Sequence, residues 1–147
     1  MSRSELSFQT DQQLMVSVSD SITAATILIV EDYAGARLMM RQALERRGFK
    51  VVEAVNGWEA IGVAARENPD LVLMDLHMPV LDGFEATCLM REHPQLKDVP
   101  IVAVSAYDSP DDLADAADAG MTDYVSKPVD LNRLYNLITR LLPVFST

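Results

Sequence analysis

Short apolar runs alternate along the chain with longer stretches in which apolar residues recur every three or four positions. An apolar run without polar alternation is typical of a parallel strand that is buried on both faces. The clearest runs are residues 27–30, 71–74 and 101–104, and weaker ones lie at 51–52 and 124–125. The sequence therefore predicts five strands, three of them fully buried.

The stretches between these runs carry helix signals. In the first, an apolar stripe with helical spacing comprises Ala36, Met39, Met40 and Ala43. Later segments begin at residues 56–57, 82–83, 109–110 and about 130, where side-chain oxygens or proline suit a helix start. We expect each apolar stripe to pack in the core. Alternating strands and helices predict an α/β fold, a doubly wound parallel sheet with helices on both faces.

Composition and charge narrow the class of protein. The chain has 147 residues, of which 49% are hydrophobic and 23% charged, with a formal net charge of -10. A surface this acidic disfavours direct binding of nucleic acid. The single cysteine, Cys88, excludes a disulfide within the chain and favours a reducing compartment. Its place in a helical pattern predicts a small packing residue.

Residues 1–25 differ from the rest of the chain. They are rich in Ser, Gln and Asp, so we expect a flexible N-terminal extension. One domain then spans residues 26–142, and 143–147 form a short tail. No apolar run is long enough for a signal peptide or a membrane span, so we expect a cytoplasmic protein without membrane insertion.

Polar side chains follow the predicted strands. In an open α/β sheet, ligands bind beyond the carboxyl ends of the strands. At these ends the sequence places Glu31 and Asp32, then Asp75, Ser105 and Lys127. A single aspartate after a strand is usually a turn residue. Three carboxylates, a hydroxyl and an ammonium at four strand ends predict a shared site.

Three clustered carboxylates repel one another, and a hard dication relieves that repulsion. Mg²⁺ (or Mn²⁺) takes oxygen ligands and keeps several waters, which leaves a face for phosphate. No His/Cys cluster is present, which argues against zinc or iron. Asp75 ends the central buried run and is the best phosphoryl acceptor, because a carboxylate can form an acyl phosphate. The turn that follows allows the backbone carbonyl of His77 to face the metal.

Four sequence blocks resemble the response-regulator receiver family. They read ILIVED at 27–32, DLVLMDLHMPVLDG at 70–83, PIVAVSA at 100–106 and DYVSKP at 123–128. The resemblance covers about residues 26–142. It implies a flavodoxin-like fold with strand order 2-1-3-4-5 and the activity of a phosphoacceptor response regulator.

The resemblance also implies roles for individual residues. Asp32 would be a direct Mg²⁺ ligand, Glu31 would often act through water, and Asp75 would be the phosphoacceptor. Lys127 would contact the phosphoryl group and precede a cis peptide bond to Pro128. Ser105 and Tyr124 would form the switch, with Ser105 binding the phosphoryl oxygen and Tyr124 becoming buried as Ser105 moves.

His77 and Tyr107 lie two residues after Asp75 and Ser105, at positions that vary in the family and tune dephosphorylation. Both are bulky, and one hypothesis is that they slow attack by water. The alternative is that both are ordinary exposed loop residues.

After Leu142 only five residues remain, so we expect a stand-alone regulator without an output domain. The expected donor is a sensor histidine kinase or a histidine phosphotransfer domain. The expected downstream contact is the face formed by the fourth helix, fifth strand and fifth helix around Tyr124. Residues 108–118 carry five aspartates, which we interpret mainly as a solvated helix face.

Other classes of function remain to be weighed. A receiver-fold interaction module without phosphorylation is the main alternative, but it gives no reason to hold repelling carboxylates together. An aspartyl-phosphate hydrolase needs a second acid where His77 stands, together with a cap domain. A flavin site needs a phosphate-binding loop where the acidic residues Glu31 and Asp32 stand. The sequence thus favours a signalling phosphoacceptor over an enzyme that acts on other substrates.

Overall fold

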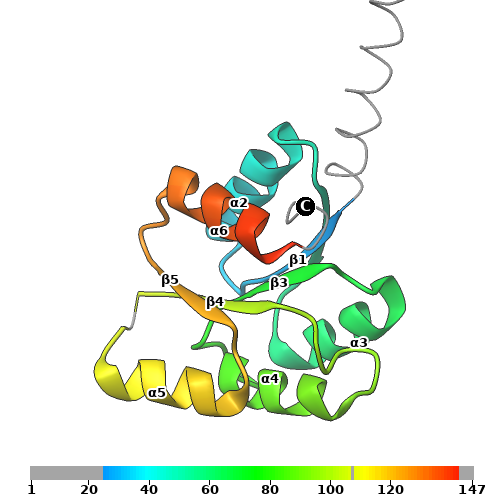
Figure 1. Cartoon of the computed structure of the whole chain (residues 1–147), viewed down its shortest axis with the longest axis vertical. Coiled ribbons are helices and arrows are strands. Elements are labelled where there is room, and N and C mark those ends of the chain that lie inside the picture. The colour runs from blue at the N-terminus through cyan, green and yellow to red at the C-terminus, as the bar shows by residue number, and fades with distance from the viewer. Residues whose placement is uncertain (1–24, 107, 143–147) are drawn as a thin grey trace, which may run out of the picture.

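The computed structural model describes residues 25–106 and 108–142, in which a parallel sheet is flanked by helices (Figure 1). The strand order is β2-β1-β3-β4-β5, and every neighbouring pair is parallel, as expected. The strands are β1 (Thr26–Val30), β2 (Lys50–Ala54), β3 (Leu71–Met74), β4 (Ile101–Ser105) and β5 (Asp123–Ser126). Prediction and structure therefore agree on all five strands.

A helix follows each strand. The helices are α2 (Ala34–Arg46), α3 (Gly57–Glu67), α4 (Gly83–Glu92), α5 (Pro110–Ala119) and α6 (Leu131–Leu141). In four of them the residue before the helix caps it, because its side chain accepts a hydrogen bond from a first-turn N–H. These caps are Asn56, Asp82, Ser109 and Asp130. Helix α2 is the exception, since Tyr33 precedes it and makes no side-chain cap.

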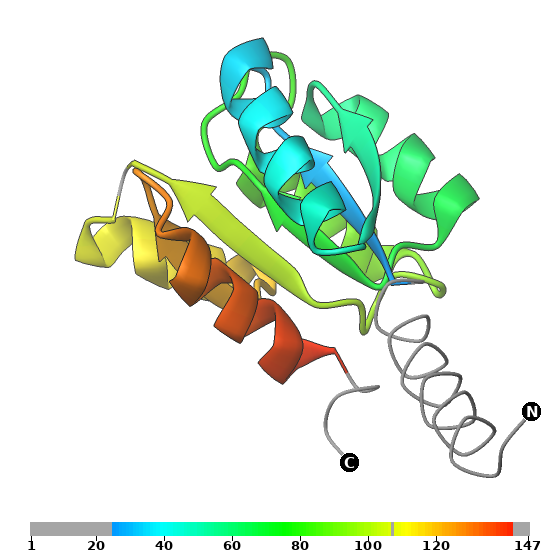
Figure 2. The same ribbon diagram turned by 90° about the horizontal axis from the view of Figure 1, so that it is seen from above.

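The helices cover both faces of the sheet (Figure 2). Helices α2 and α6 pack on one face, against alternate strand residues such as Ile29 and Leu73. Helices α3 and α4 pack on the other, against intervening residues such as Leu28 and Val72. Helix α5 lies beside α4 on that second face (Figure 1). The central strands are buried because side chains on both of their faces meet helices, as the unbroken apolar runs predicted.

Two expected core positions are wrong. Met39 is 54% exposed, and the buried stripe of α2 consists of Met40, Ala43 and Leu44. Cys88 is exposed rather than packed. The predicted stripe of α2 is thus correct at Met40 and Ala43 and wrong at Met39, because a helix with apolar residues on several sides is oriented by its neighbours.

The predicted extension and tail lie almost wholly outside the described residues. Residues 1–24 and 143–147 are not described, and Ala25 is buried directly before β1. Tyr107 also lies outside the described residues. Within the described ranges, no helix has the length and apolar character needed to cross a membrane.

Candidate functional site

The register of the central strands brings the acidic residues together. Val30 of β1 pairs with Met74 of β3, so the residues that follow these two leave the sheet side by side. The pairing extends past the strand ends, since the Asp75 N–H donates to the Val30 carbonyl (3.0 Å). The Glu31 N–H likewise donates to the Ala54 carbonyl (3.1 Å). These bonds fix the backbone from which the carboxylates project.

Glu31, Asp32 and Asp75 form one cluster, in which one carboxylate oxygen from each lies within 4.8 Å of the others. Glu31 is 1% exposed and Asp75 is 8% exposed, whereas Asp32 is exposed. Carboxylates this close, two of them buried, favour a positive partner. Oxygen ligands at this spacing suit a hard dication such as Mg²⁺.

Lys127 supplies a positive charge to the cluster. Its Nζ lies 2.5 Å from Glu31 Oε1 and 3.5 Å from Asp75 Oδ2. Burial by itself lowers the pKa of Lys127, but the hydrogen bond to Glu31 and the charges of Asp75 and Glu31 outweigh it and raise the pKa. The backbone N–H of Lys127 donates a hydrogen bond to the Ser105 carbonyl (2.9 Å). The peptide bond between Lys127 and Pro128 is cis, as expected from the resemblance. The lysine is therefore charged and anchored on both sides.

Glu31 and Asp32 differ in what they can offer to a cation. Both carboxylate oxygens of Glu31 are engaged, one by Lys127 and the other by the Tyr33 N–H (3.2 Å). Across residues 25–106 and 108–142, no hydrogen bond or ion pair involves the Asp32 carboxylate. The Asp32 carboxylate is thus the one open to a cation, whereas Glu31 is held in place by the protein.

The turn after Asp75 is tightly constrained. The His77 N–H donates to Asp75 Oδ1 (3.3 Å), and the Gly83 N–H donates to the Leu76 carbonyl (2.9 Å). A Cβ on Gly83 would collide with the Asp75 backbone carbonyl. Val80 has a φ of 73°, and the N–H of the next residue donates to the Pro79 carbonyl (2.8 Å), which is a γ-turn. Backbone strain costs stability, so a strained turn beside a carboxylate points to a functional role for that turn.

His77 contacts two helices. Its ring meets Phe84 edge-on with centroids 5.9 Å apart, and its Nε2 lies 3.8 Å from Asp112 Oδ1. Its side chain is 46% exposed. The contact with Asp112 was missed from the sequence, where that residue was counted only among the acids of a solvated helix. Asp112 is half-buried, whereas Asp111, Asp115 and Asp118 are exposed as expected.

Ser105 and Tyr124 lie beside the cluster on the side of β4 and β5. Ser105 is buried, and Tyr124 Oη donates to its carbonyl across 3.5 Å. Burial raises the pKa of Tyr124; the hydrogen bond to Ser105 opposes this, and the nearby Asp108, Asp112 and Asp75 raise it further. The tyrosine is therefore neutral and half-buried.

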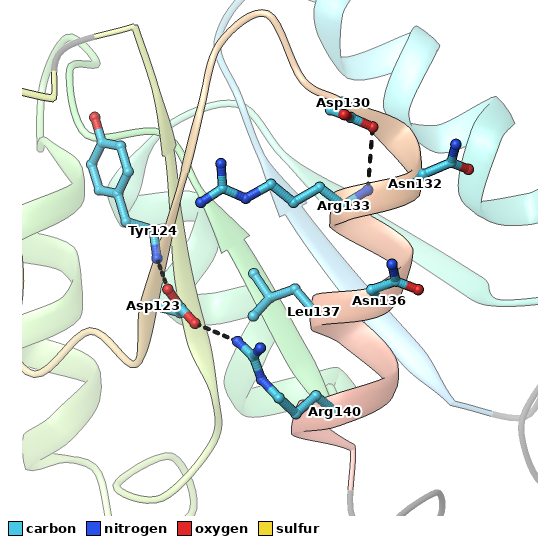
Figure 3. A pocket seen from close by; sticks show the side chains of 8 residues that line it. All are labelled: Asp123, Tyr124, Asp130, Asn132, Arg133, Asn136, Leu137 and Arg140. Carbon is cyan, nitrogen blue, oxygen red and sulfur yellow. Dashed lines mark hydrogen bonds and ion pairs between the residues drawn. The ribbon is translucent and has the colours of Figure 1, made fainter.

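A groove of about 400 Å³ lies between β5 and α6, apart from the acidic cluster (Figure 3). Asp123 lines the groove on the β5 side. Its carboxylate accepts a hydrogen bond from the Tyr124 backbone N–H (2.7 Å) and forms an ion pair with Arg140 (2.9 Å). Its other lining residues are Asp130, Asn132, Arg133, Asn136 and Leu137. This polar groove belongs to the face that the sequence assigned to a downstream partner.

Arg37 was also missed from the sequence. Its Nη1 donates to the backbone carbonyl of Glu31 (2.8 Å), and its Nε lies 3.7 Å from Glu53 Oε1. Arg37 stands three residues before Met40, on the inward side of α2. An arginine at an inward helical position was the available signal, because such a guanidinium needs acceptors.

Comparison with known proteins agrees with this geometry. The family model of the response regulator receiver domain matches residues 27–139. Protein PilH of Pseudomonas aeruginosa is 36% identical over 118 residues, which make up 80% of this chain and 98% of PilH.

Solved structures give the same result. One similar structure is the receiver domain of sensor histidine kinase PA1611 from Pseudomonas aeruginosa, which has a magnesium ion coordinated in its active site cleft. It matches with a TM-score of 0.77 at 33% identity, and the match covers 81% of this chain and 98% of that one. Another is a co-crystal structure from Saccharomyces cerevisiae, which contains the histidine phosphotransfer signaling protein Ypd1 and the receiver domain of its downstream response regulator Ssk1. A chain of that structure matches with a TM-score of 0.75 at 31% identity, and the match covers 80% of this chain and 88% of that one. This chain belongs to the response regulator receiver domain family.

Proposed function

We propose that this chain is a stand-alone phosphoacceptor response regulator that takes a phosphoryl group onto Asp75 in the presence of Mg²⁺ or Mn²⁺. The phosphorylated form then switches partner binding or relays the phosphoryl group. The observation that carries the proposal is the meeting of Asp75 with Glu31 and Asp32 within 4.8 Å, and with Lys127 at 3.5 Å. An acceptor carboxylate beside a dication site and a lysine is what phosphoryl transfer requires.

The donor set fits a hard dication. Asp32 and Asp75 would hold it directly, Glu31 would act through water, and the His77 carbonyl would complete the set. When bound, the ion neutralises charge between the acceptor carboxylate and the incoming phosphoryl oxygens. The magnesium ion in the cleft of the PA1611 receiver domain supports the assignment.

The transfer itself needs little from the protein beyond position and charge. An Asp75 carboxylate oxygen bonds to phosphorus while the P–N bond of a phosphohistidine breaks. The electron pair of that bond stays on the imidazole nitrogen, which then takes a proton from solvent. Lys127 and the Ser105 hydroxyl contact the phosphoryl oxygens. The chain acts on itself in this scheme, as a signalling phosphoacceptor that catalyses only its own phosphorylation and dephosphorylation.

The switch in this proposal runs from Ser105 to Tyr124. A phosphoryl group draws the Ser105 hydroxyl towards Asp75, and the loop after β4 follows. Tyr124 then moves further inward, which changes the surface around β5. The support is the present contact between Tyr124 Oη and the Ser105 carbonyl, and the half-buried state of the ring.

Two surfaces suit two kinds of partner. Every exposed large hydrophobic residue in the described ranges lies in a loop after a strand or in the first half of the following helix. They are Tyr33, Leu38, Met39, Val55, Trp58, Val80 and Leu113. This end of the sheet fits a sensor histidine kinase or histidine phosphotransfer domain, and the face of α5, β5 and α6 fits a downstream protein. Such donors, together with the lone cysteine, fit a cytoplasmic location.

His77 and Tyr107 are proposed to tune the lifetime of the phosphorylated state by hindering water. The support for His77 is its packing between Phe84 and Asp112, which holds a bulky ring two residues after the acceptor. Replacing both with alanine should speed loss of phosphate, and an unchanged lifetime contradicts this part of the proposal.

Labelling tests the main proposal. The full chain is incubated with acetyl phosphate and Mg²⁺, and intact mass and peptide mapping should locate one phosphoryl group on Asp75. Asp75→Asn should abolish the label, whereas Asp118→Asn, on an exposed turn of α5, should retain it. Beryllofluoride with Mg²⁺ should bind and alter the environment of Tyr124. Absence of both labelling and beryllofluoride binding would leave a receiver-fold interaction module as the better description.

A further inference from the structure

The structure assigns to Arg37 the role of a positioning residue that fixes the acidic turn for cation binding. This inference rests on the proposed function, because it concerns the affinity of the same acidic cluster for Mg²⁺. Its starting point is the hydrogen bond from Arg37 Nη1 to the backbone carbonyl of Glu31, the residue directly before Asp32.

The turn before α2 lacks a helix-capping side chain. The other four described helices begin with a capping side chain, which fixes the chain where it enters the helix. Tyr33 precedes α2 and makes no side-chain cap, and the first turn of α2 contains no acidic residue. Arg37 reaches back from the fourth position of that helix and holds the turn from its C-terminal side.

Arg37 is itself held in place. Its Nε lies 3.7 Å from Glu53 Oε1, and its side chain is 19% exposed. Glu53 lies on β2 and pairs in register with Ile29 of β1, so the carboxylate is carried by the sheet. The chain of contacts runs from a rigid strand through the guanidinium to the Glu31 carbonyl, and it thereby limits where the Asp32 backbone can lie.

Asp32 depends on this support more than its neighbours do. Glu31 is buried and tied through Lys127 and the Tyr33 N–H, and Asp75 follows a fully buried strand. Asp32 is exposed, and within the described ranges its carboxylate makes no hydrogen bond or ion pair, so its position depends on the backbone of the turn. A ligand held loosely weakens metal binding, and loss of a residue that orients ligands typically lowers affinity by about 10- to 100-fold.

The sign of the effect separates positioning from simple electrostatics. A guanidinium near a dication repels it, so removing its charge should strengthen Mg²⁺ binding if charge alone matters. Removing a positioning contact should weaken binding instead. Arg41 provides the matched control, because it lies one turn later on α2, pairs with Glu53 (2.8 Å) and Glu45 (3.3 Å), and has no contact with Glu31.

Calorimetric titration of the full chain with MgCl₂ tests the inference. Arg37→Met keeps the aliphatic stem and should weaken Mg²⁺ binding about tenfold. Arg37→Lys should lose less, and Arg41→Met should bind as tightly as the unmodified protein or slightly more tightly. Thermal unfolding shows whether each variant is folded. Folded Arg37→Met that binds Mg²⁺ as tightly as the unmodified protein, or more tightly, overturns the inference.

A second pair of variants covers failure to fold. If Arg37→Met does not fold, Glu53→Gln removes the carboxylate that orients Arg37 and should weaken binding, whereas Glu45→Gln, which affects only Arg41, should not. Equal binding by these two variants overturns the inference. If the unmodified chain binds no Mg²⁺, the proposed function fails and the inference falls with it. Normal binding in both the unmodified chain and Arg37→Met removes the inference alone.

Discussion

Each end of the sheet is held by a half-buried arginine that donates hydrogen bonds to backbone carbonyls, but the two arginines have different consequences. At the carboxyl end, Arg37 donates to the Glu31 carbonyl and lies beside Glu53. At the amino end, Arg91 near the end of α4 donates to four carbonyls just before β4 and β5. These belong to Leu96, Lys97, Val99 and Gly120, at 2.7–3.2 Å.

The difference lies in what each arginine fixes. Burial lowers the pKa of Arg91, and the charge of Asp98 only partly opposes it. The four carbonyls accept hydrogen bonds from Nε and Nη1, and they belong to loops at the opposite end of the sheet from the acidic cluster. Arg37 instead fixes a turn that carries two carboxylates. The same interaction therefore stabilises the fold at one end and organises a charged site at the other.

Helix α4 connects these two ends and offers three probes on one face. Gly83, Thr87 and Arg91 follow one another at intervals of four residues, which places them along one side of the helix. A Cβ added at Gly83 would meet the backbone of Asp75, Thr87 is fully buried, and Arg91 reaches the opposite loops.

Gly83→Ala should have the largest effect. Its Cβ would meet the Asp75 carbonyl, a backbone atom that cannot move without shifting the acceptor. Overpacking of this kind costs about 3 kcal/mol in the free energy of unfolding, and phosphorylation of Asp75 should also fall. Urea unfolding and acetyl phosphate labelling measure the two. Gly62→Ala is the control, since nothing lies within 4 Å of its Cβ position and alanine favours a helix by about 1 kcal/mol.

Arg91→Met should lower the free energy of unfolding by about 2 kcal/mol, because four carbonyls, three of them in part-buried hydrogen bonds, lose a charged donor. Its Mg²⁺ affinity should stay unchanged, since Arg91 has no contact with the acidic cluster. The contrast with Arg37→Met, which should lose Mg²⁺ affinity, is the sharpest form of the comparison. A loss of Mg²⁺ affinity in folded Arg91→Met would show that the two ends are coupled.

Thr87→Val should raise the free energy of unfolding by about 1 kcal/mol. The Thr87 hydroxyl is fully buried and has no hydrogen-bond partner in the described ranges, and removing an unsatisfied polar group recovers its desolvation cost. Urea unfolding measures the change. Val104→Thr, which places a new hydroxyl in the core beside β5, should have the opposite sign. A destabilised Thr87→Val would indicate that the hydroxyl is bonded in solution.

Alkaline pH should give the smallest effect, through Lys127 at the carboxyl end of the sheet. The pKa of Lys127 is raised above its ordinary value of 10.5, so its contribution is complete below that value and is lost as pH rises through the folded-state pKa. The free energy of unfolding should therefore fall as the pH rises from about 9 to about 11.5. Lys127→Arg, whose guanidinium stays charged, should lose less stability over this interval. Equal losses would assign the change to other groups.

Much of the site was predictable from residue types and order. The acids, the serine and the lysine each follow an apolar run, and parallel strands bring their carboxyl ends to one edge. The cis bond before Pro128 came from the family resemblance rather than from physical reasoning. Arg37 and Asp112 were missed because each looked like an ordinary charged helical residue, and their contacts join elements that are distant in sequence.

The sequence by itself determined the five strands, the helix starts and the edge of the sheet where charge gathers. It could do so because apolar runs, capping residues and strand direction are local properties or follow from chain order. Only the tertiary structure decided that Leu44 rather than Met39 is buried, that Cys88 faces solvent, and that Glu31 is enclosed while Asp32 is open. Those outcomes depend on how each helix is rotated against its neighbours and on which distant side chains reach a given atom. Both are fixed by the tertiary packing of the elements.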